Sequence, residues 1–268
     1  MTIIESIILG IIQGVTEFLP ISSSGHLVLA EAFFKLDIEN LKAFDLSLHF
    51  GTLMAVLLYF RKDFIEILKN TFSLLKANKE ERKTINKMPI YLVLGTIPIV
   101  IFGSTTDKIL DHYFRNTFSI GILAIAVGLL FFGVEYLHKK IKEKPLNEKG
   151  SFLVGIAQAL ALIPGISRSG ITISTALLLG VKREEAAKFS FLLGGIATFA
   201  AICLGVLKLF KGEFVLIDTT TLIIGVLTSF LTGIFSIAFL MEFLKKHTLK
   251  SFGIYRIILG VIILMFYL

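Results

Sequence analysis

Two short polar stretches interrupt the apolar runs of this sequence, and both bring together residue types that bind phosphate. Residues 22–26 read Ser-Ser-Ser-Gly-His, residues 167–170 read Ser-Arg-Ser-Gly, and Glu17 lies about one helical turn before the first stretch. Arginine pairs with phosphate oxygens through two parallel hydrogen bonds. Hydroxyls add donors, and glycine lets the backbone approach a ligand closely. The two stretches are therefore predicted to bind an anion of the phosphate class.

Each stretch directly precedes a segment that we expect to be helical. A helix N-terminus offers free N–H groups and the positive end of the helix dipole, and both favour a phosphate. The residues predicted to bind it are Arg168, Ser22, Ser24, Gly25, Ser167, Ser169 and Gly170.

Three charged or polar side chains beside the stretches are candidates for catalysis. Gln13 lies four residues before Glu17, on the same helix face. The Glu17 carboxylate can act as a general base or bind a divalent cation with the Gln13 carbonyl oxygen; a polar cap on the backbone is the alternative.

Arg168 lies in an apolar run, where a charge is costly and marks a functional site by default. The alternative is that Arg168 forms a structural ion pair with Glu17. Arg168 can have both roles if this ion pair opens when a phosphate binds.

Four further polar residues lie in apolar segments. His26 is interpreted as a general acid, a phosphate ligand or a nucleophile, against a structural role. Arg256 either adds to the anion site or extends to the inner headgroups. Asp45 and His49 lie four residues apart in one predicted span. They are interpreted as polar side chains that are hydrogen-bonded within their helix, in preference to side chains that line a cavity.

The composition predicts an integral membrane protein. The chain has 268 residues, 55% of them hydrophobic and only 18% charged, with a mean hydropathy of +0.84. Soluble domains are nearer 25% charged. The single cysteine excludes an intrachain disulfide, and the net charge of +7 is no sign of a nucleic-acid partner, which we do not expect.

The apolar segments predict an all-α fold with six transmembrane helices and two re-entrant helical hairpins. A span needs about 17–25 mostly apolar residues. The six predicted spans are 43–60, 88–104, 118–137, 189–208, 219–243 and 252–268. Residues 2–35 and 150–181 are broken near their middle by the polar stretches, and irregular backbone at membrane depth needs protein or a wet cavity around it. Each is therefore predicted to be a hairpin.

Basic residues set the predicted orientation. The loops 61–87, 138–150, 182–188 and 244–251 carry 19 of the 27 lysines and arginines. The positive-inside rule places these loops in the cytoplasm. Both termini are then expected outside the plasma membrane.

An internal repeat relates the two halves of the chain. A shift of 145 residues aligns Gln13 with Gln158 and the stretch 22–25 with 167–170 without a gap. The chain is thus predicted to be one membrane domain, 1–268, with repeat one at 1–137 and repeat two at 150–268. Each repeat holds a hairpin and three spans, so the second copy is inverted, and inverted repeats bring broken-helix tips together near the midplane.

The segments Gln13–His26 and Pro164–Gly170 resemble the motifs of the undecaprenyl-diphosphate phosphatase family, also called the bacitracin-resistance protein family. The first is similar to [E/Q]-x-x-x-E followed by P-x-S-S-[S/T]-G-H, and the second to P-G-x-S-R-S-G. The likeness extends to Phe189–Leu193 and to Ile254–Arg256. One departure follows the Phe189–Leu193 run, where the family usually has a proline and this chain has Gly194-Gly195-Ile196.

The resemblance implies a hydrolase that removes the terminal phosphate of undecaprenyl diphosphate at the outer face of the plasma membrane. The product is the lipid carrier for cell-wall glycan assembly, and the activity confers resistance to bacitracin. By matched position, Glu17 and Gln13 would serve a divalent cation, Mg²⁺ or Ca²⁺, and the general base. Ser23 and His26 would be the nucleophile or acid, and Arg168 would hold the phosphate.

The rival interpretation is a secondary transporter or a flippase for polyprenyl phosphate, since inverted repeats with broken helices are typical of carriers. Acid, hydroxyl, imidazole and guanidinium groups at one locus favour the enzyme. The expected partners are a polyprenyl diphosphate and membrane lipids; the oligomeric state is left open, with a homodimer among the alternatives.

Overall fold

The computed structural model describes residues 1–37, 41–114, 116–212 and 218–267, without the side chains of 104–112 and 267. Within these ranges the chain is helical and has no strand. Its helices are α1 (Ile3–Phe18), α2 (Ser23–Phe33), α3 (Lys42–Tyr59), α4 (Arg61–Lys76), the 3-10 helix η1 (Glu81–Lys83), α5 (Met88–Phe114), α6 (Thr117–His138), α7 (Glu148–Leu160), α8 (Arg168–Leu178), α9 (Arg183–Phe210), α10 (Thr219–Lys246) and α11 (Lys250–Tyr267).

Several of these helices are apolar enough to cross a membrane. Among the described residues, α6, α9 and α10 meet the requirements of length and composition, and α3 with α4 gives a fourth span if the pair, bent by 77°, is counted as one. The apolar part of α5, Met88–Gly103, is shorter. The prediction of an all-helical protein is confirmed.

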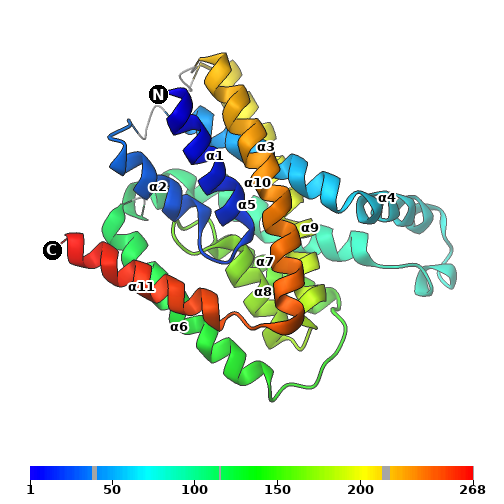
Figure 1. The fold of residues 1–268 in the computed structure, drawn as a ribbon. Helices are drawn as coiled ribbons and strands as arrows, with labels where there is room; N and C mark the ends of the chain where they lie inside the picture. The colour runs from blue at the N-terminus through cyan, green and yellow to red at the C-terminus, as the bar shows by residue number, and fades with distance from the viewer. Residues whose placement is uncertain (38–40, 115, 213–217, 268) are drawn as a thin grey trace.

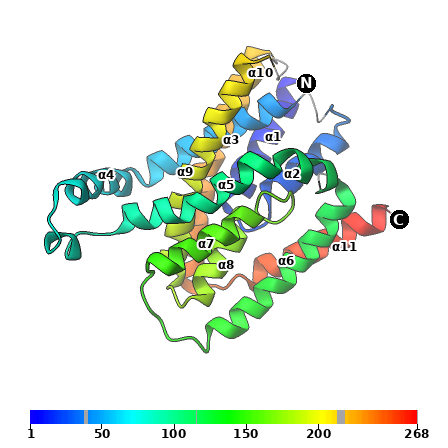
Figure 2. The ribbon, with the colours of Figure 1, turned by 180° about the vertical axis from the view of Figure 1, so that it is seen from behind.

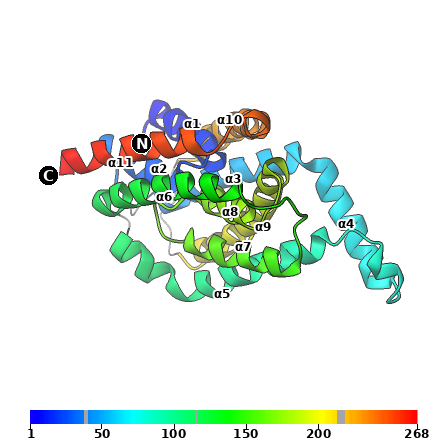
Figure 3. The same ribbon diagram turned by 90° about the horizontal axis from the view of Figure 1, so that it is seen from below.

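The helices pack in interleaved pairs rather than in chain order. α1 lies along α10, α7 along α5, and α6 along α11, so the first hairpin packs on a late helix and the second on an early one. Figure 2 shows α6 beside α11 from behind, and Figure 3 shows α4 extending away from the body of the molecule. The two broken pairs, α1 with α2 and α7 with α8, meet at the centre.

Two interhelical contacts repeat across the halves of the chain. The Ser6 hydroxyl donates to the Thr221 carbonyl oxygen at 2.6 Å, where α1 meets α10. The Ser151 hydroxyl donates to the Tyr91 carbonyl oxygen, where α7 meets α5. Ser6 and Ser151 are 145 residues apart, which is the offset of the sequence repeat. Equivalent side chains thus make equivalent bonds in the two hairpins.

A buried ion pair stabilises the turn between α10 and α11, away from the tips. Both carboxylate oxygens of Glu135 accept from Arg183, at 2.6 and 2.5 Å, and Oε1 also accepts from the Leu249 N–H at 2.9 Å. The side chain of Glu135 is wholly buried. Fully hydrogen-bonded geometry of this kind is what makes a buried charge tolerable.

Candidate active site

The tip of each hairpin has the same strained backbone. Ser22 has φ 79° and Ser167 has φ 73°, a region that serine seldom occupies. Each serine is the N-cap of the helix that follows: its hydroxyl accepts from the N–H of Gly25 at 3.3 Å or of Gly170 at 3.2 Å. The cap bonds help to offset the strain, which is typical of functional sites.

The two tips touch each other. The Gly165 N–H donates to the Ser24 hydroxyl at 3.3 Å, and the Ser169 hydroxyl donates to the Leu19 carbonyl oxygen at 3.2 Å. Residues from distant parts of the sequence thereby meet within one apolar bundle. The expected meeting of the two polar stretches is present in the structure.

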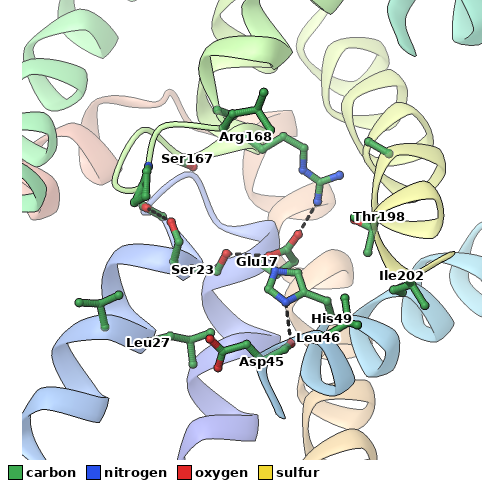
Figure 4. A pocket seen from close by; sticks show the side chains of 18 of the residues that line it. Glu17, Ser23, Leu27, Asp45, Leu46, His49, Ser167, Arg168, Thr198 and Ile202 are labelled. Atoms are coloured by element: carbon green, nitrogen blue, oxygen red, sulfur yellow. Dashed lines mark hydrogen bonds and ion pairs between the residues drawn. The ribbon is translucent and has the colours of Figure 1, made fainter. Parts of the chain in front are cut away.

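A cavity of about 400 Å³ lies where the tips meet. Its polar lining comes from both hairpins, from α3 and, at one residue, from α9, and Figure 4 shows its side chains. Apolar side chains of the hairpins and of α3, α5 and α9 form the rest, among them Leu46, Ile99 and Ile202. The polar residues are Glu17, Ser22, Ser23, Ser24, Lys42, Asp45, His49, Ser167, Arg168 and Thr198.

Glu17 is the hub of the hydrogen bonds in this cavity. Its Oε1 accepts from Nη2 of Arg168 at 2.5 Å. Its Oε2 accepts from the Ser23 hydroxyl at 2.7 Å and from Nε2 of Gln13 at 3.0 Å. Gln13 is wholly buried, and Glu17 is 9% exposed. A base is thus hydrogen-bonded to a hydroxyl, and an arginine holds the base in place, which is the arrangement of an activated nucleophile.

Arg168 keeps donors for a ligand. Its Nη1 is buried and has no hydrogen-bond partner in the described part of the chain, while Nη2 binds Glu17. Nη1 lies against Gly194 of α9, where any side chain would overlap it. The absence of a side chain at Gly194 therefore makes room for this guanidinium.

His49 belongs to the site, although the sequence favoured a satisfied helix residue. Its Nδ1 lies 2.8 Å from the Asp45 carbonyl oxygen, which can only accept, so Nδ1 carries a proton. Its Nε2 lies 3.7 Å from Oε2 of Glu17. Asp45 lines the same cavity. The available signal was a histidine four residues after an aspartate in a predicted span.

The remaining residues predicted to contact the phosphate fall into three groups. Ser22, Ser24 and Ser167 line the cavity. The N–H groups of Gly25 and Gly170 are engaged by the cap serines, and Ser169 binds the other tip. His26 and Arg256 are absent from the lining: His26, on α2, faces Tyr255 of α11, and Arg256 of α11 contacts the second tip at Gly165. The catalytic and binding roles assigned to these residues stay predictions.

The residues around Glu17 fit a divalent cation that arrives with a phosphate ligand. Among the described residues no three His, Cys, Asp or Glu side chains gather into a metal cluster. Mg²⁺, however, usually takes only one or two carboxylates together with substrate phosphates. Oε1 of Gln13 is buried without a partner beside the Glu17 carboxylate. These two side chains would hold such a cation together with the phosphate.

The fold and the site define a helical membrane protein in which two broken helices place a carboxylate, a hydroxyl and a guanidinium around one cavity. The chain belongs to the bacitracin resistance protein BacA family, whose profile matches residues 6–262.

Curated relatives match over nearly the whole chain. Proteins named undecaprenyl-diphosphatase from Geotalea daltonii and Caldicellulosiruptor bescii are each 40% identical; the matches cover 99% and 100% of this chain and 98% of either relative. Undecaprenyl-diphosphatase 1 of Pseudoalteromonas translucida is also 40% identical, over 99% of both chains.

The contact between Gly194 and Arg168 gives a prediction. Gly194→Ala is expected to displace the guanidinium from Glu17 while the fold persists, because the atom in the way is the end of a flexible side chain. Phosphate release from a polyprenyl diphosphate should fall about tenfold or more, since misplaced catalytic groups act poorly. The melting temperature in detergent should also fall, because the buried ion pair is weakened, but the protein should remain folded. Gly195→Ala is the matched control, because its methyl group would meet Val56 instead. Equal activity of the two variants would contradict the assignment.

Proposed function

We propose that this protein hydrolyses undecaprenyl diphosphate to the monophosphate and inorganic phosphate, and so recycles the lipid carrier of cell-wall glycan synthesis. One observation carries the proposal: the Ser23 hydroxyl donates to Glu17, and Glu17 is paired with Arg168, inside an apolar helical bundle. Family membership supports the same activity. The name of the family links it to bacitracin resistance, which we propose for this protein as well.

The cavity suits a substrate with a charged head and an apolar tail. Arg168 and the tip serines offer donors to phosphate oxygens, whereas Leu46, Ile99 and Ile202 line the apolar side. A water-soluble diphosphate would not need that apolar lining.

We propose that Ser23 is the nucleophile and Glu17 its base. The Ser23 oxygen attacks the terminal phosphorus, its proton passes to Glu17, and the bond to the bridging oxygen breaks so that undecaprenyl phosphate leaves. Water then hydrolyses the phosphoserine. Arg168 stabilises charge on the transferred phosphoryl group, where such catalysis gains most. Direct attack by water with Glu17 as base is the alternative.

We propose that Gln13 and Glu17 hold a divalent cation, Mg²⁺ or Ca²⁺, once the diphosphate is bound. Such an ion would supply positive charge to the diphosphate oxygens. The unpartnered carbonyl oxygen of Gln13 beside Glu17 supports this.

The finer topology is also a proposal: six spans, two re-entrant hairpins and an inverted repeat of 1–137 and 150–268. It is supported by the matching cap serines and by the matching bonds of Ser6 and Ser151. The basic loops on one side place both termini outside, and the active site is proposed to open to the outer face of the plasma membrane.

The first test is phosphate release by purified protein in detergent with undecaprenyl diphosphate. Glu17→Gln and Arg168→Lys keep the size of the side chain but remove the base or the planar fork. Each is expected to lower the rate by at least about a hundredfold. Arg82→Lys, on the exposed chain near η1, is the control and should keep full activity.

Full activity in both site variants would contradict the proposed roles. Absence of release by folded wild-type protein would favour the transporter or flippase instead. Translocation of polyprenyl phosphate in proteoliposomes would then be measured.

A second test concerns the cation. Activity should be lost in EDTA and restored by Mg²⁺. Gln13→Leu should raise the Mg²⁺ concentration for half-maximal activity by about tenfold, because one oxygen ligand is removed. Gln158→Leu is the matched control: it is the buried counterpart in the second repeat and donates to the Gly95 carbonyl oxygen at 3.4 Å. The same shift in both variants would contradict a cation site at Gln13.

A further inference from the structure

Two consecutive residues of α11 each contact one tip. The Tyr255 hydroxyl lies 2.8 Å from Nε2 of His26, and the two rings stack with 9° between their planes. Nη2 of Arg256 donates to the Gly165 carbonyl oxygen at 2.6 Å. His26 follows the first tip, and Gly165 lies in the second. One turn of α11 thus reaches both hairpins.

His26 is fully engaged in holding the first tip. Its Nδ1 lies 2.7 Å from the Ser22 carbonyl oxygen, which can only accept, so Nδ1 donates. In the neutral ring Nε2 then accepts from the Tyr255 hydroxyl. The backbone N–H of His26 also donates to the Ser22 carbonyl, at 3.2 Å. The residue braces the strained Ser22 peptide, and neither ring nitrogen is left for a proton transfer.

Arg256 is a buried charge that requires an explanation. Its side chain has no exposed surface, and in the described part of the chain it forms no ion pair with a carboxylate. Nη2 of Arg256 donates to the Gly165 carbonyl oxygen at 2.6 Å and to the Leu123 carbonyl oxygen at 3.3 Å. A buried guanidinium is costly in a membrane protein and is retained for a function. Its shortest contact fixes Gly165, whose φ of +101° shapes the second tip.

The contacts close into a ring. The Gly165 N–H donates to the Ser24 hydroxyl at 3.3 Å, which joins the second tip to the first. Ser24 and His26 lie in the same helical turn of α2. The path runs from Tyr255 through His26 to Ser24, crosses to Gly165 and returns to α11 at Arg256. A break at one point should therefore loosen both tips.

We propose that Tyr255 and Arg256 form a clasp, the α11 clasp, that fixes the spacing of the two tips and thus of Ser23 relative to Arg168. Both are positioning residues that act through His26 and Gly165, not groups that touch the phosphate. For its effect on turnover the inference rests on the proposed phosphatase activity. Its effect on the tips can be measured without that activity.

Hydrogen–deuterium exchange of the full-length protein in detergent tests the clasp. Tyr255→Phe keeps the ring stack and removes only the hydroxyl. It should speed amide exchange about fivefold in residues 19–26 and also in residues 163–170, which Tyr255 does not touch. Arg256→Leu should do the same. Tyr136→Phe is the matched control, because its exposed hydroxyl accepts only from Lys140.

Kinetics of phosphate release separate positioning from binding. Tyr255→Phe should lower kcat about tenfold, with KM within about twofold of wild type. Arg256→Lys should recover part of the activity lost in Arg256→Leu, because a lysine can still donate to Gly165. If Arg256→Leu fails to fold, Tyr255→Phe decides the matter alone.

Two results would overturn the clasp. One is faster exchange confined to residues 19–26 in Tyr255→Phe. The other is a raised KM in Arg256→Leu while amide exchange in both tips stays unchanged. That result would make Arg256 a phosphate ligand. If wild-type protein releases no phosphate, the proposed function fails, but the exchange experiment still decides the clasp.

Discussion

The hydrogen-bonded ion pair of Glu17 and Arg168 is the interaction on which the site depends. Its members are 151 residues apart, on different hairpins, and they meet inside an apolar bundle. Removing one partner of such a pair strands a buried charge at a cost of about 3–5 kcal/mol. The meeting of the two tips is thus required for stability as well as for binding. Nη1 of Arg168 has no hydrogen-bond partner in the described part of the chain, so a phosphate can bind Arg168 without a rearrangement of the site.

The two tips are similar in sequence and backbone, but a few differences between them give them different contacts. Ser22 and Ser167 share one strained cap conformation. The counterpart of Gly165 in the first hairpin is Pro20, 145 residues earlier, which has no N–H to donate. Accordingly Ser24 accepts from Gly165, whereas Ser169 donates to a carbonyl oxygen. The first hairpin carries the carboxylate and the second the arginine, so the site requires both hairpins.

Features set by local chemistry could be predicted from the sequence. Proline, glycine and serine interrupt apolar runs, so the breaks between α1 and α2 and between α7 and α8 were found. The charge in an apolar run singles out Arg168, and an ion pair with Glu17 is one of the two interpretations offered for it. The direction of a side chain depends on packing between distant helices. The sequence therefore missed His49 as a neighbour of Glu17 and Gly194 as the space for Arg168. It also gave no sign that Tyr255 and Arg256 of α11 contact His26 and Gly165 at the tips.

The most direct test of a phosphate site between the tips is an experimental structure with a bound substrate analogue. A polyprenyl methylene-bisphosphonate keeps the tail and both phosphoryl groups but cannot be hydrolysed at its carbon bridge. The account predicts the terminal group within hydrogen-bond distance of Arg168 and beside the Ser23 hydroxyl, with the tail leaving along the apolar side of the cavity. A bisphosphonate bound elsewhere, with the pair of Glu17 and Arg168 still closed, would contradict it.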